Sequence, residues 1–434
     1  MEATAERTVL FVMPRLPFPA ISGRKASLYH YCRIIHELGY RLIVAAFLEM
    51  GDNPDNKPDS IDELIILPQS SGKEKIKRLV VDTFLRRKYP IQVSIFLSGK
   101  AKKIIDDTVQ KHQPFAIIAD MVRTTEYITD VPTYRVADLD DTLSLRYERQ
   151  LKQGIGGVNP YGQFINVFPK FVRKILLFGF IKLWVNKTEI RLLKEYEINI
   201  AKACDKVVFV AAKEAETLNL KLGEPEKAVA IPIGVDTGYY STHAAIPHVS
   251  FPDDGGVYLG IHGQMTTAHN ENTAMYFIKE ILPYIIRENS NVKLLCIGGG
   301  VSENLKSLNN PNVVFTDFVD DVRSYLMACK VYVCPMQFGS GIKTKLLEAM
   351  SMGLPVVTSS TGAENIDAVD GTDFIITDEP RKFAEEVLAL LSDEKKAQRL
   401  SGNAIRYINN NWTWKRAKAE FEKLFAKIQG EEMV

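Results

Sequence analysis

Residues 339–357 read GSGIKTKLLEAMSMGLPVV, and this stretch decides the fold class because a glycine turn here joins an apolar strand to a short helix. The strand is expected in the run VYVCP at residues 331–335. The helix is expected over residues 342–352, and Gly353 and Pro355 end it. A strand, turn and helix in this order present free backbone N–H groups and the positive end of a helix dipole. The stretch therefore predicts a phosphate site.

The charges around this turn support two interpretations. Lys343 and Lys345 place cations in the first helical turn, where they oppose the dipole unless an anion is bound. Glu348 follows Lys345 by three residues, on the same helix face, where the ribose of a nucleotide would lie. The alternative is that the lysines are solvated and the glutamate is an ordinary helix former. A second polar turn, TSSTGAEN at residues 358–365, favours the ligand site because parallel sheets bind ligands where their strands end.

The whole run GSGIKTKLLEAMSMGLPVVTSSTGAEN resembles the donor-binding signature of glycosyltransferase family 4, also called glycosyltransferase group 1, the retaining GT-B enzymes. It is similar to the subgroup with the pattern GSGIxxKxLEAM. The family often has two glutamates separated by seven residues, and the first of these positions is Ser340 here. The resemblance implies that Glu348 binds the ribose hydroxyls and that Ser340 lies near the sugar or its diphosphate.

The resemblance also implies a wider set of donor contacts. The family usually has an arginine and a lysine after the first glycine turn of its C-terminal domain, but residues 263–270 read GQMTTAHN, with neither cation. We therefore expect Lys343 and Lys345 to stabilise the leaving diphosphate, with Lys345 in a catalytic role. Glu364 matches a family position near the nucleotide or sugar, although it could also be a surface carboxylate. The expected donor-binding residues are Gly23, Gly263, Ser340, Gly341, Ile342, Lys343, Lys345, Glu348 and Glu364.

Length and composition indicate an ordinary two-domain globular protein. A chain of 434 residues suits two domains of about 200 residues each. The net charge of +1 gives no indication of a nucleic-acid partner. Five cysteines are scattered in mostly apolar runs without a CxxC pair, which favours buried thiols in a reducing compartment.

No targeting or membrane-spanning segment is expected. The first apolar run, VLFVM, is too short for the core of a signal peptide. No stretch offers eighteen uninterrupted apolar residues. We therefore expect a cytoplasmic protein, with peripheral attachment to the inner membrane face as a further prediction.

The first half begins with a strand at residues 9–13, a proline-rich loop, a helix and a strand at residues 41–47. This order is typical of the βαβ unit that opens a Rossmann-like domain. The loop PRLPFPAISGRK resembles the family segment in which two glycines approach the donor phosphates. Here Gly23 is kept, and Arg24 replaces the second glycine.

Carboxylates follow two later strands of this half. A strand at residues 115–120 ends in Asp120, which we expect to point towards an interdomain cleft and to act on the acceptor in a catalytic role. The alternative for Asp120 is a loop cap. Asp138 and Asp140 form an Asp-x-Asp that could hold a divalent metal, but Asp140 or Asp141 as the cap of the next helix is the favoured interpretation. GT-B enzymes generally need no such metal, so no metal is expected.

Residues 159–187 combine aromatic and aliphatic side chains with five Lys or Arg and no acid. This composition is typical of a helix that lies in the interface of an anionic membrane. A basic helix covering the N-terminal core explains it equally well. Both interpretations stay open at this point.

The predicted fold is α/β of the GT-B type, with two Rossmann-like domains facing across a cleft and a C-terminal helix crossing back. Residues 1–235 are expected to form an acceptor-binding domain, with the basic aromatic insertion at about 150–187. Residues 236–411 would form the nucleotide-sugar donor domain, and residues 412–434 the returning helix. The run AVAIPIGVDTGYY at residues 228–240 resembles the linker of the family.

The resemblance implies a hexosyltransferase that acts with retention, in envelope polysaccharide or glycolipid assembly. The expected donor is a UDP- or GDP-sugar, which is a substrate, so no cofactor is expected. The acceptor would be a glycan, a lipid-linked molecule or a protein, with a membrane surface as a further partner and no nucleic acid. Two alternatives stay open: a nucleotide-sugar 2-epimerase of the same fold, and a non-catalytic GT-B scaffold. Ser340 and the missing arginine and lysine favour the scaffold, whereas Glu348 with its two neighbouring lysines argues against it.

Overall fold

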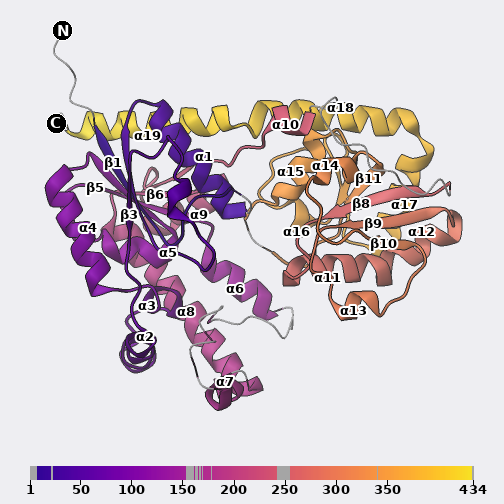
Figure 1. Cartoon of the computed structure of the whole chain (residues 1–434). Helices are drawn as coiled ribbons and strands as arrows, with labels where there is room; N and C mark the ends of the chain where they lie inside the picture. The colour runs from indigo at the N-terminus through magenta and orange to yellow at the C-terminus, as the bar shows by residue number, and fades with distance from the viewer. Residues whose placement is uncertain are drawn as a thin grey trace, which may run out of the picture. The chain divides into compact units, whose positions relative to one another are not determined.

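The computed structural model describes residues 7–20, 23–152, 161, 165, 168, 170–176, 178–241, 255–339 and 341–432. The chain divides into two compact units (Figure 1). The first unit consists of Met1–Pro232 with Ala417–Val434, and the second of Ile233–Arg416. Ser340 and most of residues 159–169 lie outside the described residues.

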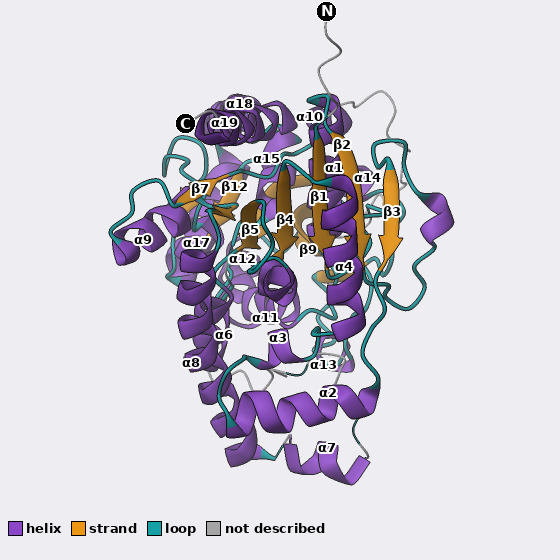
Figure 2. Cartoon of the chain, turned by 90° about the vertical axis from the view of Figure 1, so that its left-hand side faces the viewer, coloured by secondary structure: helices purple, strands orange, loops and turns teal. Residues whose placement is uncertain are grey.

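The first unit is built on a seven-stranded sheet in the order β3-β2-β1-β4-β5-β6-β7, and every neighbouring pair is parallel. Its strands are β1 (Thr8–Met13), β2 (Arg41–Ala46), β3 (Glu63–Ile66), β4 (Ala116–Asp120), β5 (Tyr134–Asp140), β6 (Lys206–Phe209) and β7 (Ala228–Ala230). All six residues of β1 are buried, which agrees with its central place and its continuous apolar sequence. Figure 2 shows these strands side by side with helices around them.

The helices of the first unit connect these strands and extend beyond the sheet. They are α1 (Gly23–Glu37), α2 (Gly72–Arg78), α3 (Ile91–Ser94), α4 (Gly99–His112), α5 (Met121–Thr124), α6 (Leu143–Lys152), α7 (Lys170–Leu176), α8 (Gly179–Ala203) and α9 (Ala212–Leu222). Short helical segments add η1 (Pro54–Asn56), the π-helix η2 (Leu79–Leu85) and η3 (Thr125–Tyr127). Local signals fix the ends of several helices. Ser71 and Glu74 form a reciprocal capping box at the start of α2, and Gly223 ends α9 in the left-handed conformation.

The last helix, α19 (Trp414–Glu432), belongs to the first unit from Ala417 onwards. The ring centroids of Phe421 and Tyr31 lie 5.0 Å apart, and those of Phe425 and Tyr40 lie 4.6 Å apart. The Phe425 side chain is fully buried. The last segment of the chain therefore completes the apolar packing of the domain that the first segment begins.

The second unit repeats the architecture with a six-stranded sheet in the order β10-β9-β8-β11-β12-β13, again with parallel neighbours throughout. Its strands are β8 (Val257–His262), β9 (Val292–Ile297), β10 (Val313–Phe315), β11 (Cys329–Cys334), β12 (Val356–Thr358) and β13 (Ile375–Ile376). Its helices are α10 (Thr237–Ser241), α11 (Ala268–Tyr276), η6 (Phe277–Ile281), α12 (Leu282–Glu288), α13 (Glu303–Lys306), α14 (Val322–Leu326), α15 (Thr344–Ser351), α16 (Ser360–Ala363), α17 (Pro380–Ser392) and α18 (Glu394–Asn411). Two parallel-sheet, Rossmann-like units confirm the predicted α/β class.

The described part of the chain contains no helix long and apolar enough to span a bilayer. The longest helix of the first unit, α8, carries charged residues along its length. Five cysteines are buried as free thiols.

Candidate functional site

The turn between β11 and α15 is formed by a left-handed glycine and by a lysine side chain that folds back over it. Gly341 adopts φ +62, a left-handed conformation that glycine accepts readily. Lys343 directly precedes α15 and donates from Nζ to the Gly341 carbonyl at 2.9 Å. Its Nζ also lies 3.9 Å from Oε2 of Glu364. The Lys343 ammonium is therefore folded back over the turn that leads into the helix.

Glu348 is held at the carboxyl end of the second sheet by His262, the last residue of β8. Nε2 of His262 lies 2.8 Å from Oε2 of Glu348. Because an ionised carboxylate only accepts hydrogen bonds, Nε2 is the donor. Burial raises the pKa of Tyr240, and the neighbouring Glu348 carboxylate raises that pKa further. The Glu348 side chain stays 23% accessible, so the same carboxylate can still meet a ligand.

Lys345 reaches the loop that follows β8. Its Nζ donates to Oδ1 of Asn270, and Nδ2 of Asn270 donates to the Gln264 carbonyl at 2.9 Å. Burial lowers the pKa of Lys345, while the neighbouring Cys334 and Glu348 act in the opposite direction. The Lys345 ammonium therefore lies beside the loop whose sequence lacks the two cations expected from the family.

Two glycines let the carboxyl ends of β8 and β9 approach each other closely. Gly263 and Gly298 have φ values of +132 and +129. A Cβ on Gly298 would lie 2.4 Å from the Gly263 carbonyl oxygen, and one on Gly263 would lie 2.6 Å from Nδ2 of Asn270. No side chain fits at these two positions, so the backbone itself lines this part of the edge.

The second polar turn is tied to the end of β11. Thr358 donates from Oγ1 to the Cys334 carbonyl at 3.0 Å, and Ser359 donates from Oγ to the Met336 carbonyl at 2.6 Å. Glu364 follows α16 in this turn and approaches Lys343 as described. The second turn is thus held to the end of β11 by hydrogen bonds and to the first turn by the ion pair of Lys343 with Glu364.

In the first unit, Arg24 gathers three carboxylates from two neighbouring strands. Its Nε donates to Asp120 at 2.9 Å, its Nη2 to Asp138 at 2.5 Å and its Nη1 to Asp140 at 3.0 Å. Burial raises the pKa of Asp138 to about 7, Arg24 opposes this shift, and Asp120 and Asp140 add to it. Gly23 begins α1 directly before this arginine.

This cluster bears on the two sequence interpretations of the Asp-x-Asp motif. The guanidinium of Arg24 occupies the place between Asp138 and Asp140 where a cation would otherwise bind. Asp141 receives a hydrogen bond from Nε of Arg146 at 2.9 Å. Within the described ranges, no group of three or more His, Cys, Asp or Glu side chains could hold a metal ion. Asp120 is fully buried against Arg24, and its action on an acceptor stays a prediction.

The second unit brings together most of the residues expected at the donor site. Lys343, Lys345, Glu348 and Glu364 lie on or beside α15 and α16, with Gly263 at the facing strand end. Ile342 is partly buried in the same turn. Sequence reasoning missed three partners of these side chains, namely His262, Asn270 and Tyr240. The position of His262, directly before Gly263 at the end of a strand, was the sequence signal that could have indicated this residue.

A cavity of about 920 Å³ opens at the other edge of the first sheet. It is lined by Phe115, Tyr134 and Asp205, which lie at or just before the starts of β4, β5 and β6. Asp205 is already paired with Arg135 at 3.0 Å. Because parallel sheets bind ligands at the carboxyl ends of their strands, we do not assign the active site to this cavity.

Comparison with known proteins gives partial sequence matches. Residues 256–393 match the family described as glycosyl transferases group 1. An uncharacterized 44.6 kDa protein in the cps region of Klebsiella pneumoniae is 24% identical over 172 residues, which are 38% of this chain and 44% of that protein. Spore coat protein SA of Bacillus subtilis (strain 168) is 28% identical over 191 residues, 39% of this chain and 50% of that protein. The chain thus spans about half the length of these curated relatives or less.

Solved structures match almost the whole chain at low sequence identity. Sucrose-phosphate synthase from Thermosynechococcus elongatus superposes with a TM-score of 0.63 at 13% identity, covering 98% of this chain and 100% of that one. HepE of Anabaena in complex with UDP gives 0.60 at 14% identity and covers 97% and 100%. WaaG, a glycosyltransferase involved in lipopolysaccharide biosynthesis, gives 0.58 at 16% identity and covers 97% and 100%. Residues 256–393 therefore match the glycosyl transferases group 1 family, and the two parallel-sheet units of the chain have the fold of solved GT-B structures.

Proposed function

We propose that this protein is a glycosyltransferase that moves a hexose from a nucleoside-diphosphate sugar to an acceptor hydroxyl with retention of configuration. The observation that carries the proposal is the grouping of Glu348 with two lysines at the carboxyl edge of the second sheet. Glu348 would accept hydrogen bonds from the ribose hydroxyls. Lys345 would meet the diphosphate from the loop after β8, and Lys343 would meet it from the start of α15.

The chemical demand in such a transfer is the negative charge of the departing diphosphate. Two partly or fully buried ammonium groups stabilise this charge more strongly than they would in water. The N–H groups at the start of α15 and in the glycine turns add dipoles that point at the same anion. Gly263 and Gly298 leave room for the phosphates to approach the backbone.

The proposed step forms one bond at the anomeric carbon and breaks another on the same face of the sugar. The acceptor oxygen bonds to the anomeric carbon as the bond from that carbon to the diphosphate oxygen breaks. The acceptor proton passes to the departing phosphate oxygen, so atoms and charge balance without a protein nucleophile. The protein would contribute positioning and charge stabilisation.

The comparisons support the substrate class and the biological setting of this proposal. HepE is described in complex with UDP, with UDP and glucose, and with UDP-glucose, so a UDP-sugar is the first donor to test. One relative belongs to a cps region, and WaaG is described as acting in lipopolysaccharide biosynthesis. We therefore propose envelope polysaccharide or glycolipid assembly as the setting.

A thermal-shift screen with UDP, GDP, dTDP, CMP and ADP tests the donor site, because a ligand that binds only the folded state raises the melting temperature. We expect a rise with UDP or GDP. Product analysis with and without an acceptor then separates a transferase from a 2-epimerase, which needs no acceptor. No rise with any of the five nucleotides would contradict the proposal and favour the non-catalytic scaffold.

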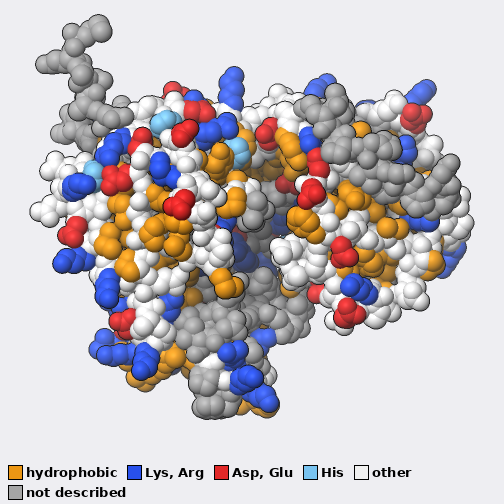
Figure 3. Space-filling model, viewed as in Figure 1, with side chains coloured by type: hydrophobic (Ala, Val, Ile, Leu, Met, Phe, Trp, Pro, Cys, Tyr) orange, Lys and Arg blue, Asp and Glu red, His pale blue; other side chains and the backbone are white. Residues whose placement is uncertain are grey.

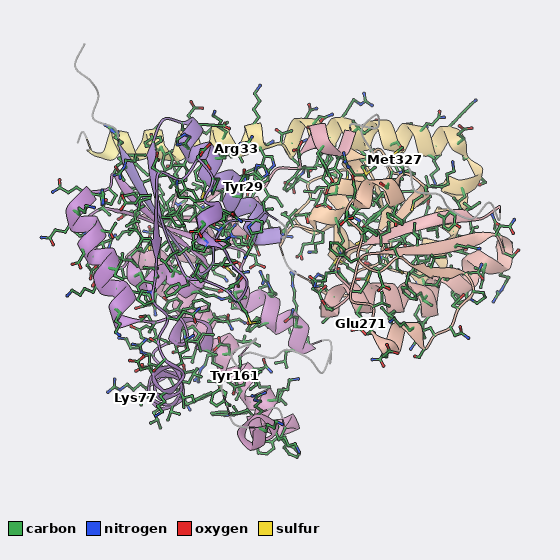
Figure 4. All side chains as sticks on the ribbon, in the orientation of Figure 1. Tyr29, Arg33, Lys77, Tyr161, Glu271 and Met327 are labelled. Carbon is green, nitrogen blue, oxygen red and sulfur yellow. The ribbon has the colours of Figure 1, made fainter. Side chains whose placement is uncertain are left out.

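We further propose that the first unit docks on an anionic membrane through a basic lobe, which we define as residues 72–88 together with the described part of residues 161–187. The two segments pack on a shared apolar cluster that includes Leu79, Ile95 and Val185, and the ring of Phe84 stacks on that of Trp184 at 5.7 Å. Lys77 on α2 and Tyr161 are both labelled in the lower part of the first unit in Figure 4. Part of the basic aromatic stretch therefore packs against residues 79–96 of the first unit.

Other side chains of the basic lobe point to solvent. Six large apolar residues are between 43% and 73% exposed: Val80, Leu85, Phe178, Phe180, Leu183 and Trp184. The lobe contains twelve Lys or Arg: Lys73, Lys75, Lys77, Arg78, Arg86, Arg87, Lys88, Lys170, Arg173, Lys174, Lys182 and Lys187. Its acidic residues are Glu74 and Asp82. Figure 3 shows Lys and Arg side chains beside hydrophobic ones over this part of the first unit. Exposed apolar groups among cations suit a bilayer with anionic lipids.

Flotation with vesicles that contain phosphatidylglycerol tests this docking. Changing Arg86 and Arg87 to Glu reverses two charges in residues 72–88, the half of the basic lobe that only the structure identified. We expect a clear loss of flotation, because each cation near an anionic surface contributes about 1 kcal/mol. The matched control changes Lys382 and Lys395 of the second unit to Glu. Unchanged recovery of the lobe variant would refute the docking surface.

A further inference from the structure

Three arginines follow the carboxyl ends of three neighbouring strands in the first unit. Arg15 lies two residues beyond β1, Arg123 lies three residues beyond β4, and Arg146 lies six residues beyond β5. These strands are consecutive in the sheet and run parallel, so their ends share one edge. Ligands of parallel α/β sheets bind at this edge.

The three arginines differ in how they are neutralised. Arg146 donates from Nε to the carboxylate of Asp141 at 2.9 Å. Arg123 instead donates from Nε to the neutral amide oxygen of Gln92 at 3.0 Å. The structure shows no ion pair of Arg123 with any residue that it describes. Arg123 is therefore a cation whose charge no neighbouring carboxylate balances directly.

Arg15 is also incompletely paired. Its Nη1 lies 3.8 Å from Oε1 of Glu49, which is a loose ion pair. The other oxygen of Glu49 lies 3.4 Å from Nζ of Lys25, so two cations share this carboxylate. Nε of Arg15 is buried and has no hydrogen-bond partner among the described residues. A buried N–H without a partner costs free energy that a bound acceptor would recover.

The electrostatic surroundings of Arg123 agree with this geometry. Burial, together with repulsion from Arg15 and Arg146, lowers the pKa of Arg123 to about 10, while Tyr147 and Asp120 act in the opposite direction. Two neighbouring cations therefore act on this guanidinium, and Tyr147 and Asp120 offset them only in part. Burying like charges together is unfavourable unless an anion accompanies them.

We infer that Arg123 and Arg15 bind an anionic group of the acceptor, a phosphate or a carboxylate, at the carboxyl edge of the first sheet. The inference rests on the proposed function, since it names the class of acceptor. A guanidinium presents paired N–H donors that match both groups. Gln92 and the ring of Phe96, whose centroid lies 5.3 Å from the guanidinium carbon, hold the plane of Arg123. The remaining N–H donors are thus already oriented before the anion arrives.

The test measures the melting temperature of the full chain as inorganic phosphate is titrated at constant ionic strength. We expect the wild-type melting temperature to rise, and Arg123→Gln to weaken the apparent phosphate affinity at least about tenfold. Arg15→Gln serves as a second variant, because this side chain is partly exposed and its loss is less harmful to folding. Arg33→Gln, on the solvent side of α1, is the matched control and should respond as the wild type does.

Two further arms make the outcome decisive. Lys345→Met removes a cation from the donor site of the second unit, so a retained phosphate response in this variant separates the two sites. Glucose 6-phosphate, glucuronate and glucose then show whether a phosphate or a carboxylate is preferred. Wild-type phosphate affinity in both Arg123→Gln and Arg15→Gln would overturn the inference. If no nucleotide binds but the Arg123-dependent response persists, the anion site stands and the proposed transfer fails.

Discussion

Replacing Glu348 by Ala separates a ligand-binding carboxylate from a purely structural one. Hydrogen bonds from the ribose to a charged acceptor would be lost, and because each contributes about 1.5–3 kcal/mol, the loss of even one corresponds to about tenfold to hundredfold weaker binding of UDP. The same change removes the acceptor of His262 Nε2, which lies 2.8 Å from the carboxylate. Because the His262 side chain is 5% exposed, its unpaired N–H should lower the free energy of unfolding by about 1–3 kcal/mol.

Isothermal titration calorimetry with UDP and 2′-deoxy-UDP isolates the first effect. If Glu348 binds the ribose, the loss of the 2′-hydroxyl weakens binding to the wild type much more than binding to Glu348→Ala. Glu348→Gln keeps an oxygen that can accept from His262, so it should retain most of the stability while binding UDP less tightly. Glu280→Ala, an exposed change in the same unit, is the control.

An equal deoxy penalty in the wild type and in Glu348→Ala would refute a ribose contact. Glu348 would then serve only to hold His262 at the end of β8. In that case the melting temperature would fall, but the affinity of the folded protein for UDP would not.

Three further predictions concern charge and packing. The pKa of Asp138 is raised to about 7, so the folded chain holds a proton that the unfolded chain releases above about pH 4. Stability should therefore fall as the pH rises from about 4 to 7. Asp138→Asn should make this fall shallower in thermal melts, and an equal slope in the variant and the wild type would contradict the prediction. Gly298→Ala should lower the free energy of unfolding by about 2–5 kcal/mol in urea titrations, because the new Cβ would clash with Gly263 and alanine would be strained at this positive φ. The control Gly402→Ala lies in a helix, where the new Cβ meets no neighbouring atom, so it should not show this loss. Lys345→Met should weaken UDP binding about tenfold or more in calorimetry without changing the affinity for uridine, and an equal loss for both ligands would rule out a diphosphate contact.

The alternation of strands and helices could be predicted from sequence because each strand is a short apolar run followed by a polar turn. The six residues of β1 are all buried, as an uninterrupted apolar run in a parallel sheet should be. The helix expected over residues 342–352 is found at Thr344–Ser351, and Gly353 follows it in the left-handed conformation. Local turn chemistry is therefore enough to place this element.

Contacts between distant residues could not be predicted in the same way. Arg24 pairs with carboxylates 96 to 116 positions away, and only the sheet order brings these strand ends together. The basic lobe joins residues 72–88 to residues about 100 positions later, so composition revealed only one of its halves. His262 meets Glu348 across 86 positions for the same reason. One sequence carries no direct record of such pairings, because they depend on the order in which strands pair.

The place of α19 in the first unit has a consequence for biosynthesis. Chains emerge from the ribosome from the N-terminus onwards, and domains generally fold as units during synthesis. Phe421 and Phe425 pack on the rings of Tyr31 and Tyr40, yet they are translated only after the whole second unit. The first unit would therefore be completed only after the second unit has been translated, and the nascent chain would carry an uncovered apolar face until α19 left the exit tunnel.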